Sequence, residues 1–209
     1  MTAEYQPPSA FNNAFYWLCQ TFCWCLFKFI WRLEVTGTEN VPLEGGLLIA
    51  CNHLSLADPP LISVSSPRKL YFFAKEELFR IPVVGWGLNH LNAFPVRRYE
   101  HDIGAFKKAQ HLLRSGQAVL LFPEGRRNKT GELGQAKAGV GMLAYKTGAR
   151  VVPVCIMNSN RMGRMKKLKV RFGAPLSPPQ SVLDQDRYQT FSDSVLAAVA
   201  ELQSKMYNE

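Results

Sequence analysis

Hydrophobic and polar residues are distributed along this chain in two different ways. Residues 11–33 are almost continuously apolar, whereas from residue 34 onward short apolar runs are separated by Gly, Pro and polar residues. Short apolar runs predict strands, and longer runs with helical periodicity predict helices. Strands are predicted at 33–37, 46–51, 69–74, 92–96, 117–122, 150–157 and 166–173. Helices are predicted at 59–64, 81–91, 103–116, 137–148 and 187–206.

Strands that alternate with helices are typical of layered α/β proteins. We therefore predict one α/β domain over residues 34–209, with a mixed, largely parallel sheet flanked by helices. No linker, internal repeat or low-complexity run divides this part of the chain. Residues 1–33 are predicted to form a separate membrane-associating segment.

The apolar N-terminal segment has the periodicity of a helix. Its tryptophans recur every seven residues and share one stripe with polar side chains, while Phe and Leu occupy the opposite side. The tryptophans are Trp17, Trp24 and Trp31, and the opposite side comprises Phe11, Phe15, Leu18, Phe22, Leu26, Phe29 and Leu33. Indole rings suit the lipid headgroup layer and Phe and Leu suit acyl chains, which favours a helix lying in the membrane plane. A single membrane span and a buried core or oligomerisation helix are the alternatives.

The charge of the chain is strongly uneven. The formal net charge is +9, and the basic surplus falls entirely after residue 60. Such a surplus indicates contact with phosphates, in a nucleic acid, an anionic membrane or a phosphorylated substrate. No helix-turn-helix, zinc finger or RNP motif is recognisable, so no nucleic-acid partner is expected. The five cysteines lack the spacing of a metal site, and a reduced setting is expected.

The pair His53 and Asp58 stands between a predicted buried strand and the helix at 59–64. Loops that follow the strands of an α/β sheet usually carry its active site. A carboxylate bonded to one imidazole nitrogen fixes the tautomer and lets the other nitrogen accept a proton from an alcohol. The alternative is that Asp58 caps the helix ahead of Pro59. The five-residue spacing by itself does not decide between the two.

Basic residues follow two further predicted strands. Arg97 and Arg98 come after the strand at 92–96, and Glu124, Gly125, Arg126 and Arg127 come after the strand at 117–122, with Lys137 beyond them. Guanidinium groups bind phosphates in a bidentate way, and lysine acts as a point charge. A solvated charge run is the alternative for the adjacent arginines. If the strand ends converge, a candidate base and candidate phosphate binders share one site.

Five ordered blocks between about Val41 and Pro153 resemble the lysophosphatidic acid acyltransferases, also called 1-acyl-sn-glycerol-3-phosphate acyltransferases. "NHLSLAD" matches the family's Asn-His-x4-Asp block, with His53 and Asp58 in their places. "AKEELFRIPVVGW" resembles the block that begins with Lys75. "AFPVRR", "FPEGRR" and "VVPV" resemble the three later blocks. Arg126 stands where the family commonly has Thr, and Arg97 where it often has Asp.

The resemblance implies a reaction and a role for each residue. His53, oriented by Asp58, would deprotonate the free hydroxyl of a lysophospholipid, most simply 1-acyl-glycerol-3-phosphate. That oxygen would attack the thioester of acyl-CoA or acyl carrier protein in one direct transfer. The substrate-binding residues implied are Lys75, Arg98, Glu124, Gly125, Arg126, Arg127 and Lys137.

No metal and no bound cofactor are expected, and Cys51 is expected to pack in the core rather than act as a nucleophile. The predicted localisation is at a membrane, on its cytoplasmic face, with anionic lipids as partners. The alternatives are another acceptor, such as a lyso-ornithine lipid, or a basic membrane-binding protein without enzymatic activity.

Overall fold

The computed structural model describes residues 10–97, 102–179 and 186–208 of the 209-residue chain. The helices are α1 (Ala10–Ile30), α2 (Asp58–Ser65), α3 (Glu76–Phe79), α4 (Pro82–His90), α5 (Ile103–Arg114), α6 (Gly139–Thr147) and α7 (Arg187–Tyr207). The strands are β1 (Glu34–Thr36), β2 (Leu47–Cys51), β3 (Leu70–Lys75), β4 (Ala93–Val96), β5 (Ala118–Leu121), β6 (Arg150–Met157) and β7 (Lys169–Phe172). Two 3-10 helices, η1 (Thr38–Asn40) and η2 (Ser159–Arg164), complete the described elements.

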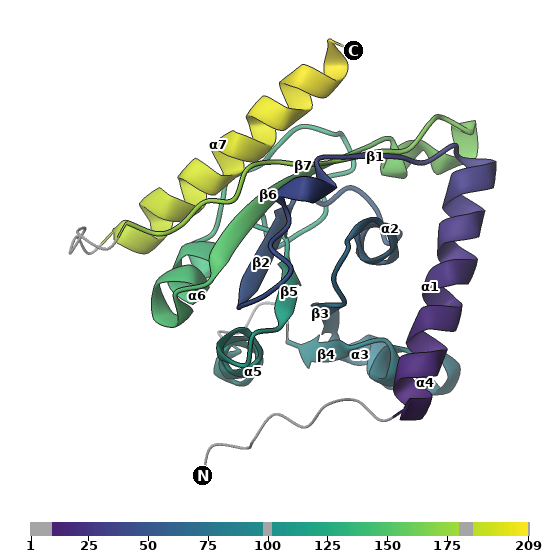
Figure 1. Cartoon of the computed structure of the whole chain (residues 1–209), viewed down its shortest axis with the longest axis horizontal. Coiled ribbons are helices and arrows are strands. Elements are labelled where there is room, and N and C mark those ends of the chain that lie inside the picture. The colour runs from purple at the N-terminus through teal and green to yellow at the C-terminus, as the bar shows by residue number, and fades with distance from the viewer. Residues whose placement is uncertain (1–9, 98–101, 180–185, 209) are drawn as a thin grey trace.

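The seven strands form one sheet in the order β1-β7-β6-β2-β5-β3-β4. Neighbouring strands are parallel except β6 and β7, which are antiparallel. Helices lie on both sides of the sheet, with α1 and α2 on one side and α5, α6 and α7 on the other (Figure 1). The predicted mixed, largely parallel sheet flanked by helices is therefore confirmed.

The central strand β2 shows how the sheet is buried. All five of its residues are inaccessible to solvent. Leu47 and Ile49 pack into the cluster that includes Phe27 of α1, while Leu48 and Ala50 pack into the cluster on the opposite face. Successive side chains of a strand point to opposite faces, so a strand covered on both faces must be apolar at every position. This is why residues 46–51 read as an unbroken apolar run.

The first helix is packed against the sheet domain rather than standing apart from it. The Tyr16 hydroxyl lies 2.8 Å from the Ser63 hydroxyl on α2, and the Gln20 amide donates to the Ser63 carbonyl at 2.8 Å. Burial raises the pKa of Tyr16 above its ordinary value. Phe27 is almost completely buried in the main core. The division of the chain at residue 33 stays a prediction.

The outer side of α1 carries exposed apolar residues. Four residues of the predicted acyl-facing side have exposed fractions of 60–75%, namely Phe11, Leu18, Phe22 and Phe29. Two details of the prediction were wrong, because the helix ends at Ile30. Leu33 lies beyond the helix and is buried in the core, and the Trp31 indole donates to the Met162 carbonyl at 2.8 Å instead of facing outward. Within the described ranges, no helix has the length and hydropathy required to cross a bilayer.

Candidate active site

The carboxyl ends of five strands meet at one edge of the sheet. Because β6, β2, β5, β3 and β4 are all parallel to one another, the segments that follow them leave the sheet on the same side. These segments contain His53 after β2, Lys75 at the end of β3, Arg97 after β4, Glu124 after β5 and η2 after β6. Ligands of open α/β sheets bind outside this edge. The predicted convergence of the strand ends is present in the fold.

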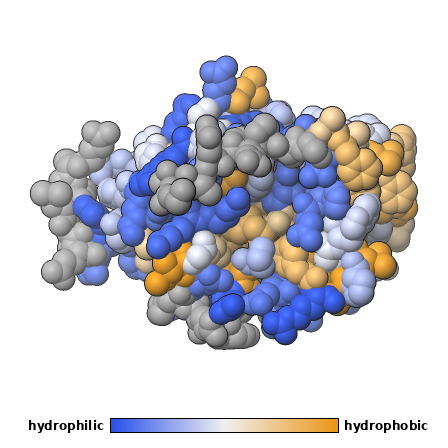
Figure 2. Space-filling view, turned by 90° about the horizontal axis from the view of Figure 1, so that it is seen from below, coloured by the Kyte–Doolittle hydropathy of each residue, from blue (hydrophilic) through white to orange (hydrophobic). Residues whose placement is uncertain are grey.

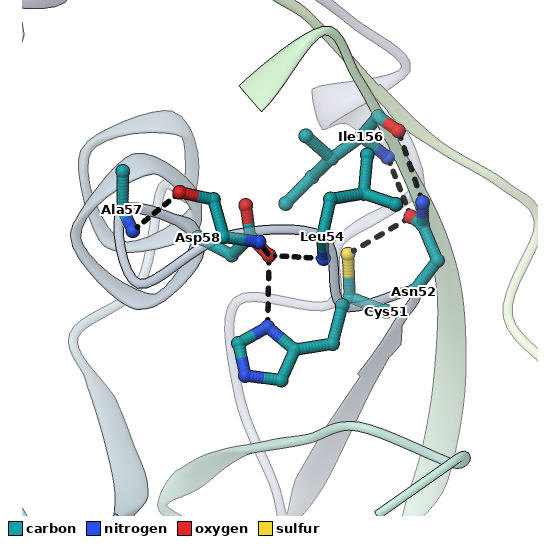
Figure 3. A network of polar contacts seen from close by, with 8 residues as sticks. Cys51, Asn52, Leu54, Ala57, Asp58 and Ile156 are labelled. Atoms are coloured by element: carbon teal, nitrogen blue, oxygen red, sulfur yellow. Dashed lines mark hydrogen bonds and ion pairs between the residues drawn. The ribbon is translucent and has the colours of Figure 1, made fainter. Parts of the chain in front are cut away.

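His53 and Asp58 form a buried hydrogen-bonded pair. The Nδ1 atom of His53 lies 2.8 Å from Oδ2 of Asp58, and the exposed fractions of the two residues are 5% and 0%. Oδ2 also accepts the backbone N–H groups of Leu54 at 2.6 Å and Ser55 at 2.7 Å. Figure 3 shows the carboxylate turned back toward the loop that carries the histidine. The pair is therefore held by three hydrogen bonds to one oxygen.

Asp58 does not cap the helix in the way its sequence position allowed. It is the first residue of α2, the residue before it is Ala57, and no side chain makes a cap hydrogen bond at this helix start. Its carboxylate binds N–H groups that precede the helix instead. Pro59 and Pro60 have no N–H to offer, so a side chain here has fewer donors to cap. The geometry favours the orientation of His53 over helix capping.

The bond to Asp58 determines which imidazole nitrogen carries hydrogen. An ionised carboxylate only accepts hydrogen bonds, so Nδ1 donates and the Nε2 atom of the neutral ring keeps its lone pair. None of the described residues forms a hydrogen bond with Nε2. The ring stacks on Phe122 with centroids 3.8 Å apart and planes 13° apart. The carboxylate and the phenyl ring together hold the imidazole on its Nδ1 side and on one face.

Asn52 fixes the end of β2 immediately before His53. Its side-chain oxygen accepts the Ile156 N–H at 2.7 Å, and its amide donates to the Ile156 carbonyl at 3.0 Å (Figure 3). The neighbouring Cys51 is fully buried, and this burial raises its pKa well above the ordinary thiol value. A thiol that stays protonated is a poor nucleophile. The expected packing role of Cys51 agrees with these surroundings.

The segment after β5 makes a tight turn beside His53. The backbone N–H of Asn128 donates to the His53 carbonyl at 2.7 Å, which ties the two segments together. Glu124 is buried, and one of its oxygens accepts the Gly134 N–H at 2.9 Å. Its second oxygen has no hydrogen-bond partner among the described residues. A buried carboxylate oxygen in this state has capacity for a further donor.

Gly125 and Lys137 lie against one another. Gly125 has φ +67°, a conformation that favours glycine, and an added Cβ would lie 3.0–3.2 Å from the outer atoms of the Lys137 side chain. The backbone N–H of Lys137 also donates to the Pro123 carbonyl at 2.9 Å. The turn after β5 therefore determines where the ammonium group of Lys137 lies.

The other predicted substrate-binding residues are placed differently. Arg126 and Arg127 are exposed on the turn, and Lys75 pairs with Glu77 at 2.9 Å. Arg97 pairs with Glu76 at 2.9 Å, so this additional cation is engaged by α3. Arg98 lies outside the described residues. The contacts between these side chains and a substrate remain predictions.

Two features of the site were not singled out from sequence. Asn128 and Phe122 contact His53 through a backbone hydrogen bond and a ring face, and neither contact has a local sequence signal. Both are contacts between the β2 and β5 segments, roughly 70 residues apart in sequence. Across the described part of the chain, no cluster of His, Cys, Asp and Glu has the arrangement of a metal site.

Comparison with known proteins identifies related acyltransferases. The 1-acyl-sn-glycerol-3-phosphate acyltransferase of Bacillus subtilis is 28% identical over 195 residues, which cover 88% of this chain and 97% of the relative. A chloroplastic 1-acyl-sn-glycerol-3-phosphate acyltransferase of Arabidopsis thaliana is 31% identical over 63% of this chain. The crystal structure of the acyltransferase PlsC from Thermotoga maritima superposes with a TM-score of 0.72 at 27% identity, covering 91% of this chain and 81% of that chain.

The fold and the His–Asp pair together define an α/β protein with a candidate acid–base site at the carboxyl edge of its sheet. The family model described as Acyltransferase matches residues 32–157, and the chain belongs to this acyltransferase family. The resemblance seen in the sequence motifs is thereby confirmed. The alignment with the Arabidopsis protein spans only 38% of the length of that relative.

Proposed function

We propose that this protein is a 1-acyl-sn-glycerol-3-phosphate acyltransferase that uses His53 as general base. The observation that carries the proposal is the Asp58 oxygen with three hydrogen bonds, which holds the Nδ1 side of His53 at the carboxyl edge of the sheet and leaves Nε2 without a partner among the described residues. The relatives named above support lysophosphatidic acid as the acceptor.

The reaction proceeds without a covalent enzyme intermediate. Nε2 takes the proton of the acceptor hydroxyl as its oxygen attacks the thioester carbonyl, which forms the ester C–O bond. The tetrahedral intermediate collapses, the C–S bond breaks, and the imidazolium returns the proton to the departing thiolate. Asp58 stabilises the imidazolium between these two proton transfers. Neither of the buried thiols, Cys51 and Cys155, is required, since direct transfer needs no acyl-enzyme.

Binding of the acceptor phosphate is assigned to the basic residues of the turn after β5 and to the neighbouring strand ends. Arg127 and Lys137 approach the phosphate from the β5 side, with Arg98, Arg126 and Lys75 as further cations. The free oxygen of Glu124 accepts a hydrogen bond from a guanidinium or from the acceptor. Gly125 has no side chain, which lets the Lys137 side chain lie close to the backbone of the turn. The thioester donor, acyl-CoA or acyl carrier protein, is a co-substrate, and neither a metal nor a bound cofactor takes part in the proposed reaction.

The membrane is the proposed source of the acceptor. The exposed stripe of α1 continues onto α4, where Val83 and Trp86 have exposed fractions of 81% and 49%. Phe15 and Trp86 pack edge to face at 4.9 Å and join the two helices. Figure 2 shows apolar side chains gathered at the end of the molecule where α1 and α4 lie. An apolar face of this kind, next to basic residues, suits the surface of an anionic bilayer.

The decisive experiment compares wild type, His53→Ala and His111→Ala in a thiol-release assay with palmitoyl-CoA, with and without lysophosphatidic acid. We expect acceptor-dependent release that falls about 10²–10⁴-fold in His53→Ala. His111 lies on α5 and serves as the matched histidine control. We expect His111→Ala to have the activity of wild type. Release without acceptor indicates a thioesterase. Thiol release that requires a different lysophospholipid would identify that lipid as the acceptor. Equal release rates in His53→Ala and wild type would refute the general-base role.

A further inference from the structure

A basic pocket lies beside the candidate active site and has no role in the mechanism above. It has a volume of about 410 Å³ and is formed by the turn after β5 and by η2. Its lining residues are Lys129, Thr130, Asn160, Arg161, Gly163 and Arg164. Ligand-binding pockets of proteins commonly have volumes of about 300–1,000 Å³. The pocket is therefore large enough for a phosphorylated group of a substrate.

The chemistry of the pocket is that of an anion site. Lys129, Arg161 and Arg164 supply three cations, and no carboxylate lines the pocket. Among the described residues, none pairs with these three side chains. Other cations of the same basic run are engaged: Lys167 pairs with Glu34, and Arg171 donates to the Thr36 hydroxyl at 3.1 Å. Arginine and lysine in a concave site that lacks acids favour a group with several negative charges.

Hydrogen bonds hold the two walls of the pocket in place. The Asn160 amide donates to the Lys129 carbonyl at 2.7 Å and joins η2 to the turn. Within the turn, Asn128 accepts the Thr130 hydroxyl at 2.8 Å and donates to the Glu132 carbonyl. The same Asn128 donates its backbone N–H to the His53 carbonyl. The pocket is thus connected to the segment that carries the candidate base.

The η2 wall of the pocket and part of the proposed acceptor site lie on opposite sides of β2. In the sheet, β2 is flanked by β6 on one side and by β5, β3 and β4 on the other. The pocket wall η2 follows β6, whereas Lys75 of the proposed acceptor site ends β3. A transfer reaction between two phosphate-bearing substrates needs cations for both phosphate groups. The η2 wall supplies cations on the β6 side of His53 that the proposed acceptor site does not use, while the turn after β5 contributes cations to both sites.

We propose that this pocket binds the phosphate groups of coenzyme A when an acyl-CoA thioester is the donor. The proposal rests on the proposed acyl transfer and names the donor. Coenzyme A carries several phosphates at the end remote from the thioester, and its pantetheine arm separates them from the reacting carbonyl. A concave pocket with three cations fits this compact polyanion better than it fits the broad acidic surface of a carrier protein.

The test is the double variant Arg161→Gln/Arg164→Gln, with Lys107→Gln/Lys108→Gln on α5 as a control that removes the same charge from an exposed helix. We expect the KM for palmitoyl-CoA to rise roughly tenfold or more in the pocket variant. The KM for lysophosphatidic acid and kcat should change less than about twofold, and the control should match wild type. Thermal unfolding compares the folded state of all three proteins.

Binding of free coenzyme A, measured by calorimetry without acceptor, separates this proposal from the proposed function. If wild type binds coenzyme A and the pocket variant loses that binding, the pocket assignment stands even when no acceptor is acylated. Equal Kd values in the two proteins overturn it. A rise in the acceptor KM alone also overturns it. A loss of binding only to anionic vesicles overturns it as well and indicates a lipid headgroup site. Turnover of an acyl carrier protein thioester without coenzyme A binding overturns it in favour of a protein donor.

Discussion

The side chain of Asn52 binds both backbone polar groups of Ile156, accepting from the N–H at 2.7 Å and donating to the carbonyl at 3.0 Å. Asn52 follows β2 directly and Ile156 lies in the neighbouring parallel strand β6, and Asn52 is fully buried. The side chain thereby continues the pairing of β2 with β6 past Cys51, where the regular register ends. His53 follows directly, so this clamp determines where the candidate base leaves the sheet.

Replacing Asn52 with Ala should destabilise the fold and lower activity together. The change leaves the Ile156 N–H buried without a partner, and we expect the free energy of unfolding to fall by about 2–4 kcal/mol. Urea denaturation measures this loss. Asn89→Ala, at an exposed position of α4, should change stability by less than about 0.5 kcal/mol. Equal stabilities of the two variants would show that the clamp contributes nothing.

Replacing Asp58 with Asn should lower kcat while the protein stays folded. All three hydrogen bonds go to the Oδ2 position, so the amide oxygen of asparagine can take that place and still accept from Leu54, Ser55 and Nδ1 of His53. The amide carries no negative charge, so it stabilises the imidazolium that forms in the reaction less than the carboxylate does. We expect kcat to fall by about 10²–10⁴ with the acceptor KM little changed. Circular dichroism and steady-state kinetics check both parts, and an unchanged kcat contradicts the orienting role.

Replacing Gly125 with Ala should disturb Lys137 as well as the backbone. The positive φ costs about 1–2 kcal/mol for a residue with a Cβ, and the new methyl group displaces the lysine side chain. We expect the acceptor KM to rise several-fold. Gly45→Ala is the matched control, because Gly45 has φ +77° and nothing within 4 Å of the added atom. We expect both variants to lose similar stability, and only Gly125→Ala to raise the acceptor KM. A wild-type acceptor KM in Gly125→Ala would show that Lys137 does not bind the phosphate.

The cysteines should differ in reactivity according to burial. Burial raises the pKa of Cys155 to about 12 and that of Cys51 well above the ordinary value. Both stay protonated in the native protein at neutral pH, so maleimide should label only the three α1 cysteines, Cys19, Cys23 and Cys25. The unfolded thiols ionise at lower pH than the native ones, so stability is full below the unfolded pKa and falls as pH rises above it. Mass spectrometry of native and denatured protein counts the labels, and rapid labelling of native Cys51 contradicts the prediction.

An added charge on the exposed stripe of α1 should weaken membrane attachment. Phe22 has an exposed fraction of 66% on this side, so Phe22→Glu changes the surface without touching the core. We expect weaker co-sedimentation with phosphatidylglycerol-containing vesicles. Thr21→Glu adds the same charge at the adjacent exposed position, on the side predicted to face headgroups, and should bind closer to wild type. Equal binding of Phe22→Glu and wild type would locate the membrane contact elsewhere.

The regular elements were largely predictable because their cause is local. Residues 46–51 and 150–157 are apolar at nearly every position, and both form strands buried on two faces. The 166–173 segment alternates, and in β7 Val170 and Phe172 are buried while Lys169 and Arg171 are partly exposed. The end of α1 was predicted three residues too late, because Leu33 is apolar for the core rather than for the helix. The short helices α3 and η2 were not predicted, since three to six residues carry too little periodicity.

By itself, the sequence determined the α/β class, the order of most elements, and the family, because apolar periodicity and ordered motif blocks are written along the chain. It also placed His53 and Asp58 in one loop. Only the tertiary structure decided between a helix cap and a hydrogen bond to His53, because the answer depends on which groups the Asp58 carboxylate reaches. The contacts of Asn52 with Ile156 and of Asn128 with His53, and the basic pocket beside them, likewise exist only where distant segments meet. The pairing of strands brings these distant segments together, and the pairing cannot be deduced from the order of residues in one sequence.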